Sequence, residues 1–175
     1  TGDIEKIVST DKVIFPGVGE AETTMNYLRQ HKLDEVIRGL KQPTLGICIG
    51  MQLMCRHSEE GDVDCLGIFD ADVRKFQADQ AAGVKVPHMG WNALSELRTN
   101  LFAGMSDGDF VYFVHSFAAD VSEDTIAVSD NGRRFSAAMR KGNFYGAQFH
   151  PEKSGRPGLQ ILQNFYKICQ EAAHV

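Results

Sequence analysis

Long apolar runs, a secretory signal and excess positive charge are all missing from this sequence. No stretch approaches the roughly 20 apolar residues that a membrane-spanning helix needs, and no signal segment opens the chain. The formal net charge of −5 supplies no basic surface for nucleic acid or anionic lipid. We therefore expect a cytosolic protein that binds small molecules or other proteins, with no nucleic-acid or membrane partner.

Cysteine is scarce as well. A reducing compartment disfavours disulfides, and the cysteine positions follow no disulfide framework. A zinc site that combines the first three cysteines with His57 fits no common ligand spacing. We expect no metal, and we interpret all cysteines but the first as packing residues. The four are Cys48, Cys55, Cys65 and Cys169.

What is present fits one globular domain. The chain has 175 residues, of which 43% are hydrophobic and 23% charged, which is enough to enclose one core. It contains no internal repeat, linker or low-complexity tract. We therefore predict a single domain over residues 1–175.

The first half of the chain alternates strand and helix signals. Val13–Phe15 is an apolar run ended by a Pro-Gly turn, and apolar residues at helical spacing follow from Glu22 to Leu40. Thr44–Cys48 is a second apolar run that leads into a predicted helix over Met51–Arg56. This alternation is typical of an α/β fold with a mostly parallel sheet and helices on both faces.

The second half is rich in β-branched and aromatic residues, which predicts short strands added to the sheet in antiparallel fashion. The chain then ends in a predicted amphipathic helix, Gly158–Ala172, with Leu159, Ile161, Phe165 and Tyr166 among its buried residues. The predicted extended segments are 66–76, 85–97, 110–117, 125–128, 135–140 and 143–149.

A cysteine stands between two glycines where the second predicted strand meets a helix, in the pattern Gly46-Ile47-Cys48-Ile49-Gly50. G-x-C-x-G is the thiol counterpart of the nucleophile elbow, in which a strained turn holds the nucleophile clear of the sheet. The helix N-terminus favours thiolate over thiol, so we expect the attacking form to be populated near neutrality. A small buried cysteine with incidental glycines is the alternative interpretation.

A candidate base lies at the end of the last predicted strand, in the motif Phe149-His150-Pro151-Glu152. His150 and Glu152 are two residues apart, so an extended backbone sends both side chains to one face. Glu152 can then orient His150 as the general base for Cys48. A lone motif of this kind is more often a turn with a solvated carboxylate.

Acyl transfer also requires N–H donors for a developing oxyanion. The N–H of Ile49 directly follows the nucleophile, and the turn over residues 16–19 offers Val18 or Gly17. A phosphate cradle at the same turn would lack a lysine, and Glu20 would repel the anion. We therefore predict an oxyanion hole from Val18, Gly17 and Ile49.

Together these motifs resemble the class I glutamine amidotransferases. More narrowly, the chain is similar over nearly its whole length to the glutaminase subunits of imidazole glycerol phosphate synthase, in GICIGMQLM, SEEG, LGIF, KVPHMGWN, YFVHSF and YGAQFHPEKSG. The resemblance implies a flavodoxin-like fold and a Cys-His-Glu triad that needs no cofactor. In that triad Cys48 attacks the glutamine carboxamide to form a glutamyl thioester, His150 transfers protons and Glu152 holds His150.

The resemblance also implies a pocket for L-glutamine. Gln52 matches the position that contacts the substrate, and Gly50 belongs to the same pocket. The backbone of His115, Ser116 and Phe117 matches the segment that receives the amino-acid end of glutamine.

The partner implied by the resemblance is a (β/α)8-barrel cyclase. It receives ammonia through a protected tunnel and forms imidazole glycerol phosphate and an aminoimidazole carboxamide ribonucleotide in histidine biosynthesis. His88, Met89, Trp91 and Asn92 would lie at the interface. In this family a strand and a helix, roughly thirty residues, precede the segment where this chain starts, so we expect one sheet position and one covering helix to be missing.

Three alternatives remain open at this point. A class I glutaminase of another biosynthetic pathway would share the triad and differ in its partner. A peptidase-like enzyme or γ-glutamyl hydrolase would act without a second protein. A flavodoxin-like binding module would bind phosphate at the turn over residues 16–19 and leave the cysteine inert.

Overall fold

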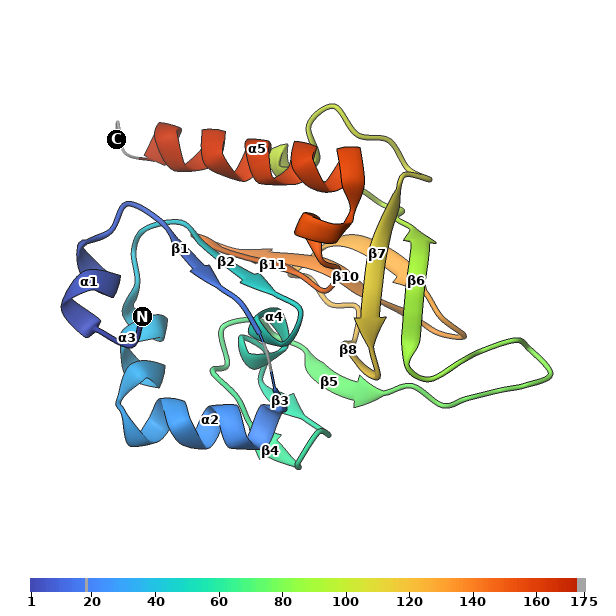
Figure 1. The fold of residues 1–175 in the computed structure, drawn as a ribbon, viewed down its shortest axis with the longest axis horizontal. Coiled ribbons are helices and arrows are strands. Elements are labelled where there is room, and N and C mark those ends of the chain that lie inside the picture. The colour runs from blue at the N-terminus through green and yellow to red at the C-terminus, as the bar shows by residue number, and fades with distance from the viewer. Residues whose placement is uncertain (18, 173–175) are drawn as a thin grey trace.

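A five-stranded sheet in the order β1-β2-β11-β10-β9 forms the centre of the computed structural model, which describes residues 1–17 and 19–172 (Figure 1). The strands β1 (Val13–Phe15), β2 (Thr44–Ile47) and β11 (Phe144–Ala147) are parallel neighbours. The antiparallel additions are β10 (Arg134–Lys141) and β9 (Thr125–Asp130). The predicted α/β class with a parallel sheet extended by antiparallel strands is confirmed.

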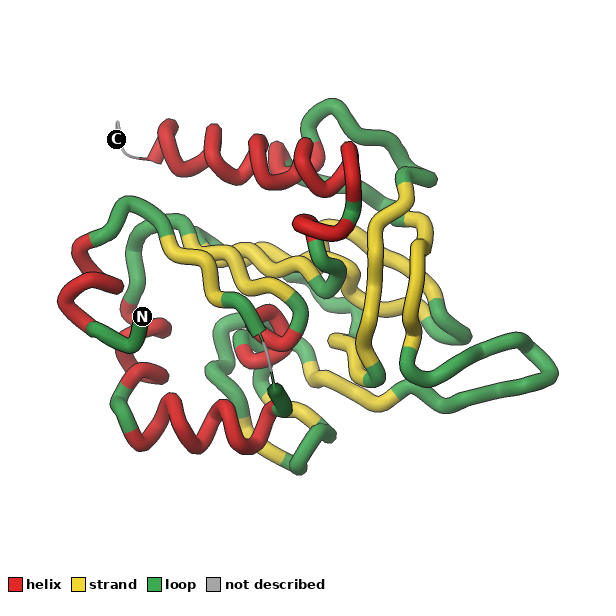
Figure 2. The backbone as a smooth tube through the Cα atoms, viewed as in Figure 1, coloured by secondary structure: helices red, strands yellow, loops and turns green. Residues whose placement is uncertain are grey.

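Helices cover both faces of this sheet (Figures 1 and 2). The long helix α5 (Gly155–Ala172) crosses one face. The other face carries α2 (Ala21–Gln30), α3 (Leu33–Gly39) and the short α4 (Ile49–Leu53), with α1 (Ile4–Ser9) beside α3. This layering buries apolar side chains on each side of the sheet.

Two smaller sheets extend the molecule beside the central one. The first has the order β4-β3-β5-β8, and the second pairs β6 with β7 in antiparallel fashion. Single-turn helices η1 and η2 lie before β7 and after β11. The bounds are β3 (His57–Ser58), β4 (Val63–Asp64), β5 (Asp72–Lys75), β6 (His88–Ala93), η1 (Asn100–Phe102), β7 (Phe110–His115), β8 (Phe117–Ala119) and η2 (Pro151–Lys153).

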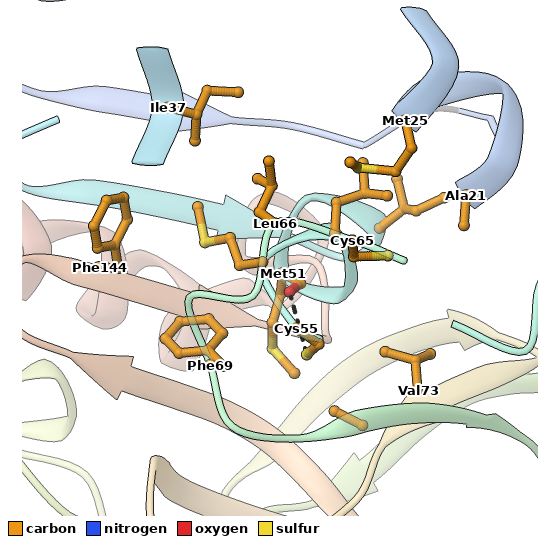
Figure 3. Close-up of a cluster of buried hydrophobic side chains, with 14 of the residues drawn as sticks. Ala21, Met25, Ile37, Met51, Cys55, Cys65, Leu66, Phe69, Val73 and Phe144 are labelled. Atoms are coloured by element: carbon orange, nitrogen blue, oxygen red, sulfur yellow. Dashed lines mark hydrogen bonds between the residues drawn. The ribbon is translucent and has the colours of Figure 1, made fainter. Parts of the chain in front are cut away.

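The buried face of α4 anchors one of the two hydrophobic clusters (Figure 3). Met51 is fully buried there, and Cys55 donates its thiol to the Met51 carbonyl oxygen at 3.7 Å. Cys65 and Cys169 are also buried and unbridged, so the interpretation of these three cysteines as packing residues is confirmed.

Several predicted elements differ from the observed ones. The helix predicted over 22–40 is broken, because Lys32 adopts a left-handed conformation with φ of 56° between α2 and α3. The strand β11 pairs in parallel with β2 and is not one of the antiparallel additions. In α5, Leu159 and Tyr166 are 56% and 51% exposed, so their predicted burial is wrong.

No helix within residues 1–17 or 19–172 is both long and apolar enough to cross a membrane.

The buried Gly158 allows α5 to pack closely against the segment that carries His150. A Cβ built on Gly158 would lie 1.9 Å from the Pro151 carbonyl oxygen, which is backbone and cannot move aside cheaply. We expect Gly158→Ala to lower the free energy of unfolding by about 2–3 kcal/mol, measured by urea denaturation. The matched control is Gly39→Ala in α3, whose Cβ would meet nothing within 4 Å. It should leave stability unchanged or raise it by up to about 1 kcal/mol.

Candidate active site

The two key side chains leave the same edge of the central sheet. The strands β2 and β11 pair in register, with Gly46 opposite Gly146, and the Cys48 N–H donates to the Ala147 carbonyl oxygen at 2.7 Å. Cys48 follows the end of β2, and His150 follows the end of β11. Because the strands are parallel neighbours, both residues lie at their carboxyl ends, the usual position of an α/β site.

Glycines allow α4 to approach the sheet closely. A Cβ on Gly46 would lie 2.8 Å from Gly50 backbone atoms, and one on Gly146 would lie 2.5 Å from Met51 Cγ. A Cβ on Gly50 would lie 2.0 Å from the Phe15 carbonyl oxygen. The glycines on either side of Cys48 therefore have a packing role, as the elbow pattern predicted.

Cys48 has the strained backbone that an elbow requires. Its φ of 54° and ψ of −115° lie outside the usual regions for a residue with a Cβ, and α4 begins at the next residue. The strained strand-to-helix turn predicted from G-x-C-x-G is confirmed.

The thiol itself is less acidic than the sequence suggested. Burial, as the largest effect, raises the pKa of Cys48 to about 11. Glu60 and Glu152 act in the same direction, while the Ile49 N–H and Lys153 oppose them. The predicted population of thiolate near neutrality is therefore wrong. The physical reason is that α4 has only five residues, so its N-terminus offsets the loss of hydration only in part.

His150 is held in an orientation suited to a base. Its Nδ1 lies 2.9 Å from Glu152 Oε1, which assigns the ring proton to Nδ1 when the carboxylate is ionised. Its Nε2 is buried and has no hydrogen-bond partner among the described residues. The backbone is fixed too, since the His150 N–H donates to Tyr112 O and its carbonyl accepts from Ser154 Oγ at 2.6 Å. The imidazole therefore keeps one nitrogen available for a proton.

The structure describes two of the three predicted oxyanion donors. The Ile49 N–H faces the Cys48 sulfur. Gly17 packs against α4, because a Cβ there would lie 1.8 Å from Ile49 Cγ2. Val18 lies outside the described residues.

The residues predicted to bind glutamine come from segments far apart in the chain. Gln52 is buried in α4, and its Nε2 donates to Phe117 O and to Gln148 Oε1, both at 2.8 Å. This contact brings the segment over residues 115–117 against α4. His115 is buried, and its Nδ1 lies 2.8 Å from the same Phe117 oxygen. Gly50 is buried beside Gln52 in α4.

Two residues close to Cys48, Gln148 and Glu60, were not predicted from the sequence as part of the site. Gln148 is fully buried, with its Nε2 3.7 Å from Cys48 Sγ. Strand alternation places residues 148 and 150 on one face, so this spacing could have predicted that Gln148 lies near the site. Glu60 Oε2 accepts a hydrogen bond from the Ala21 N–H at 3.0 Å, and burial raises the pKa of the Glu60 carboxyl. Glu60 was visible only as part of the SEEG segment, because nothing local links it to Cys48.

The four predicted interface residues divide into two pairs. Met89 and Trp91 are 63% and 54% exposed on β6. His88 is instead buried, with its Nδ1 2.9 Å from His115 Nε2, and Asn92 is partly buried, with its Nδ2 3.1 Å from His88 Nε2. The prediction that His88 forms part of a docking surface is therefore wrong, because its side chain points into the core.

Within the described residues, no three His, Cys, Asp or Glu side chains gather as metal ligands. The residues of the zinc alternative have other contacts: Cys55 bonds to Met51 O, Cys65 to Val63 O, and His57 pairs with two aspartates.

The raised pKa of Cys48 has a direct consequence for its reactivity. We expect native Cys48 to react with iodoacetamide more slowly than free cysteine at pH 8, with a rate that continues to rise towards pH 11, because only the thiolate attacks. Mass spectrometry of the Cys48 peptide measures the rate, and Cys48→Ser gives the background from the three buried cysteines. A rate that levels off near pH 7 would contradict this expectation.

Comparison with known proteins agrees with the geometry. The family model described as glutamine amidotransferase class-I matches residues 3–169. The chain is 58% identical over 168 residues to the imidazole glycerol phosphate synthase subunit HisH of Bacteroides fragilis, covering 96% of this chain and 85% of that protein. It is 46% identical to the HisH subunit of Escherichia coli strain K12, covering 95% and 84%.

Solved structures agree at the level of the fold. A crystal structure described as glutamine amidotransferase superposes with a TM-score of 0.67 at 18% identity, covering all of this chain and 85% of that one. A glutamine amidotransferase from Thermotoga maritima gives a TM-score of 0.59 at 19% identity, covering 93% and 65%. The chain belongs to the class-I glutamine amidotransferase family, among the HisH subunits of imidazole glycerol phosphate synthase.

Proposed function

We propose that this chain is the glutaminase subunit of imidazole glycerol phosphate synthase and that it hydrolyses L-glutamine at Cys48. The observation that carries the proposal is the shared sheet edge, where a strained cysteine and an imidazole paired to Glu152 leave neighbouring parallel strands. Nucleophile, base and orienting carboxylate are the three groups that this chemistry needs.

The proposed reaction begins with proton transfer from Cys48 Sγ to His150 Nε2. The sulfur attacks the carboxamide carbon, and the Ile49 N–H stabilises the oxyanion. His150 then returns the proton to the leaving nitrogen, so ammonia departs and a glutamyl thioester remains. Water, deprotonated by His150, attacks the thioester and releases glutamate and the thiol. Glu152 stabilises the imidazolium in both halves.

Recognition of glutamine requires a group for its ammonium. Glu60 is a partly buried carboxylate whose charge acts on Cys48. A carboxylate in this place can pair with the substrate ammonium at short range. We assign it that role beside the pocket of Gln52, Gly50 and the 115–117 backbone. Pairing would also remove part of the repulsion that disfavours the Cys48 thiolate.

Ammonia is proposed to pass to a cyclase subunit with a (β/α)8 barrel, which uses it in histidine biosynthesis. Ammonium is no nucleophile, so transfer must occur out of bulk water. The exposed apolar side chains of Met89, Trp91 and Phe110 lie on the paired strands β6 and β7 and suit the core of such an interface. The neighbouring β7 residue Tyr112 contacts both Ser154 Oγ and the His150 N–H, so this surface adjoins the base.

Removing the triad residues tests the reaction. Cys48→Ala should abolish glutamine hydrolysis and leave the ammonia-driven reaction of the complex intact, measured by glutamate release and by product formation from ammonium salts. His150→Ala should lose about 10³-fold in kcat, because proton transfer is lost. Glu152→Ala should lose less than His150→Ala, because Glu152 only orients the imidazole. Wild-type glutaminase activity in Cys48→Ala would refute the proposal, and equal turnover of γ-glutamyl peptides without the cyclase would favour a hydrolase.

The proposed interface is tested by truncating its anchor. Trp91→Ala should weaken binding of the cyclase subunit by about 30-fold or more in Kd, measured by calorimetry. Tyr166→Ala is the matched control, because Tyr166 is 51% exposed on α5, about three helical turns beyond Gly155, the α5 residue that lies against Trp91. Equal effects of the two substitutions would place the partner elsewhere.

A further inference from the structure

Gln148 lies next to Cys48 and takes no part in the proposed reaction. It is fully buried and follows β11 directly, and its Nε2 lies 3.7 Å from Cys48 Sγ. A buried carboxamide is costly unless its polar atoms are bonded, so its contacts define what it does.

The orientation of the Gln148 amide follows from the chain of contacts. Phe117 O is a carbonyl oxygen and can only accept, so the Gln52 atom 2.8 Å away must be Nε2. The second hydrogen of that NH2 group is directed at Gln148, 2.8 Å away, which must present Oε1. The Nε2 of Gln148 is therefore the atom that faces the sulfur. A flipped Gln148 would set two NH2 groups against each other.

The Phe117 carbonyl oxygen, which is the first acceptor in this series of hydrogen bonds, is itself held in place. Burial, as the largest effect, lowers the pKa of His115 to about 3, so the ring is neutral and carries one proton. That proton is on Nδ1, because His115 Nδ1 faces the Phe117 carbonyl oxygen at 2.8 Å. Its Nε2 accepts from His88 Nδ1. Phe117 O thus accepts from both His115 and Gln52. This fixes the direction of the hydrogen bonds from Gln52 to Gln148 and from Gln148 to Cys48.

We propose that Gln148 is a positioning residue for the nucleophile, which holds Cys48 Sγ by an N–H donor and stabilises the thiolate relative to the thiol. The inference deepens the proposed function, since it rests on Cys48 as the nucleophile. The charged and titratable groups around this sulfur are Glu60 after β3 and His150, Glu152 and Lys153 at η2. Two carboxylates oppose one ammonium there, so the neutral donors in contact with the sulfur, the Ile49 N–H and the Gln148 Nε2, are the groups that favour the anion.

The test reads the thiol directly. Gln148→Met has a similar shape and no N–H, and we expect it to lower the iodoacetamide alkylation rate of Cys48 about tenfold at each pH from 7 to 10, equivalent to one pKa unit. In the complex with the cyclase, its glutaminase kcat should fall with KM for glutamine within twofold, because the defect lies in the nucleophile. Gln163→Met, on the exposed side of α5, is the matched control and should change neither.

A double-mutant cycle separates positioning from packing. Gln52→Met releases Gln148 from its fixed orientation and should also slow alkylation, but it should add nothing further in the Gln148→Met background. Additive losses, or an unchanged alkylation rate in folded Gln148→Met, would overturn the inference. If Gln148→Met fails to fold, Gln52→Met alone decides, because an unchanged rate there has the same meaning. If the wild-type complex fails to hydrolyse glutamine, the proposed function is refuted. The alkylation rates would still show whether Gln148 stabilises the Cys48 thiolate.

Discussion

The parallel pairing of β2 with β11 is the constraint on which the site depends. These two strands bring Cys48 and His150, about a hundred residues apart in the chain, to one sheet edge. The pairing sets Gly46 opposite Gly146, and the missing side chains leave the space in which α4 lies against both strands. A Cβ at either position would push α4 outward and carry the strained turn at Cys48 away from His150.

The same close packing makes the thiol hard to ionise. Removal of Cys48 from water outweighs the Ile49 N–H and the charge of Lys153, and two nearby carboxylates add to the effect. His150 Nε2, which has no hydrogen-bond partner among the described residues, fits this state, because a protonated candidate nucleophile needs a base that can accept its proton. In the proposed reaction the thiol therefore has to pass its proton to His150 before the sulfur can attack.

Local sequence patterns predicted the elements that local chemistry controls. Val13–Phe15 was predicted with its observed bounds, and the strained turn at Cys48 followed from G-x-C-x-G. The break at Lys32 was missed, since helical periodicity continues across it. The parallel pairing of β11 was missed because strand partners are chosen by long-range packing. The burial of His88 also depends on β7, which lies more than twenty residues further along the chain.

The sequence by itself determined the α/β class, through the alternation of strand and helix patterns along the chain. It also determined the candidate nucleophile with its strained turn and the pairing of His150 with Glu152, because these depend on neighbours within a few residues. Only the tertiary structure decided the protonation state of the thiol, the burial of His88 and the place of Gln148 and Glu60 at the site. Those properties arise from loss of water and from contacts between distant segments, and neither is encoded in local spacing.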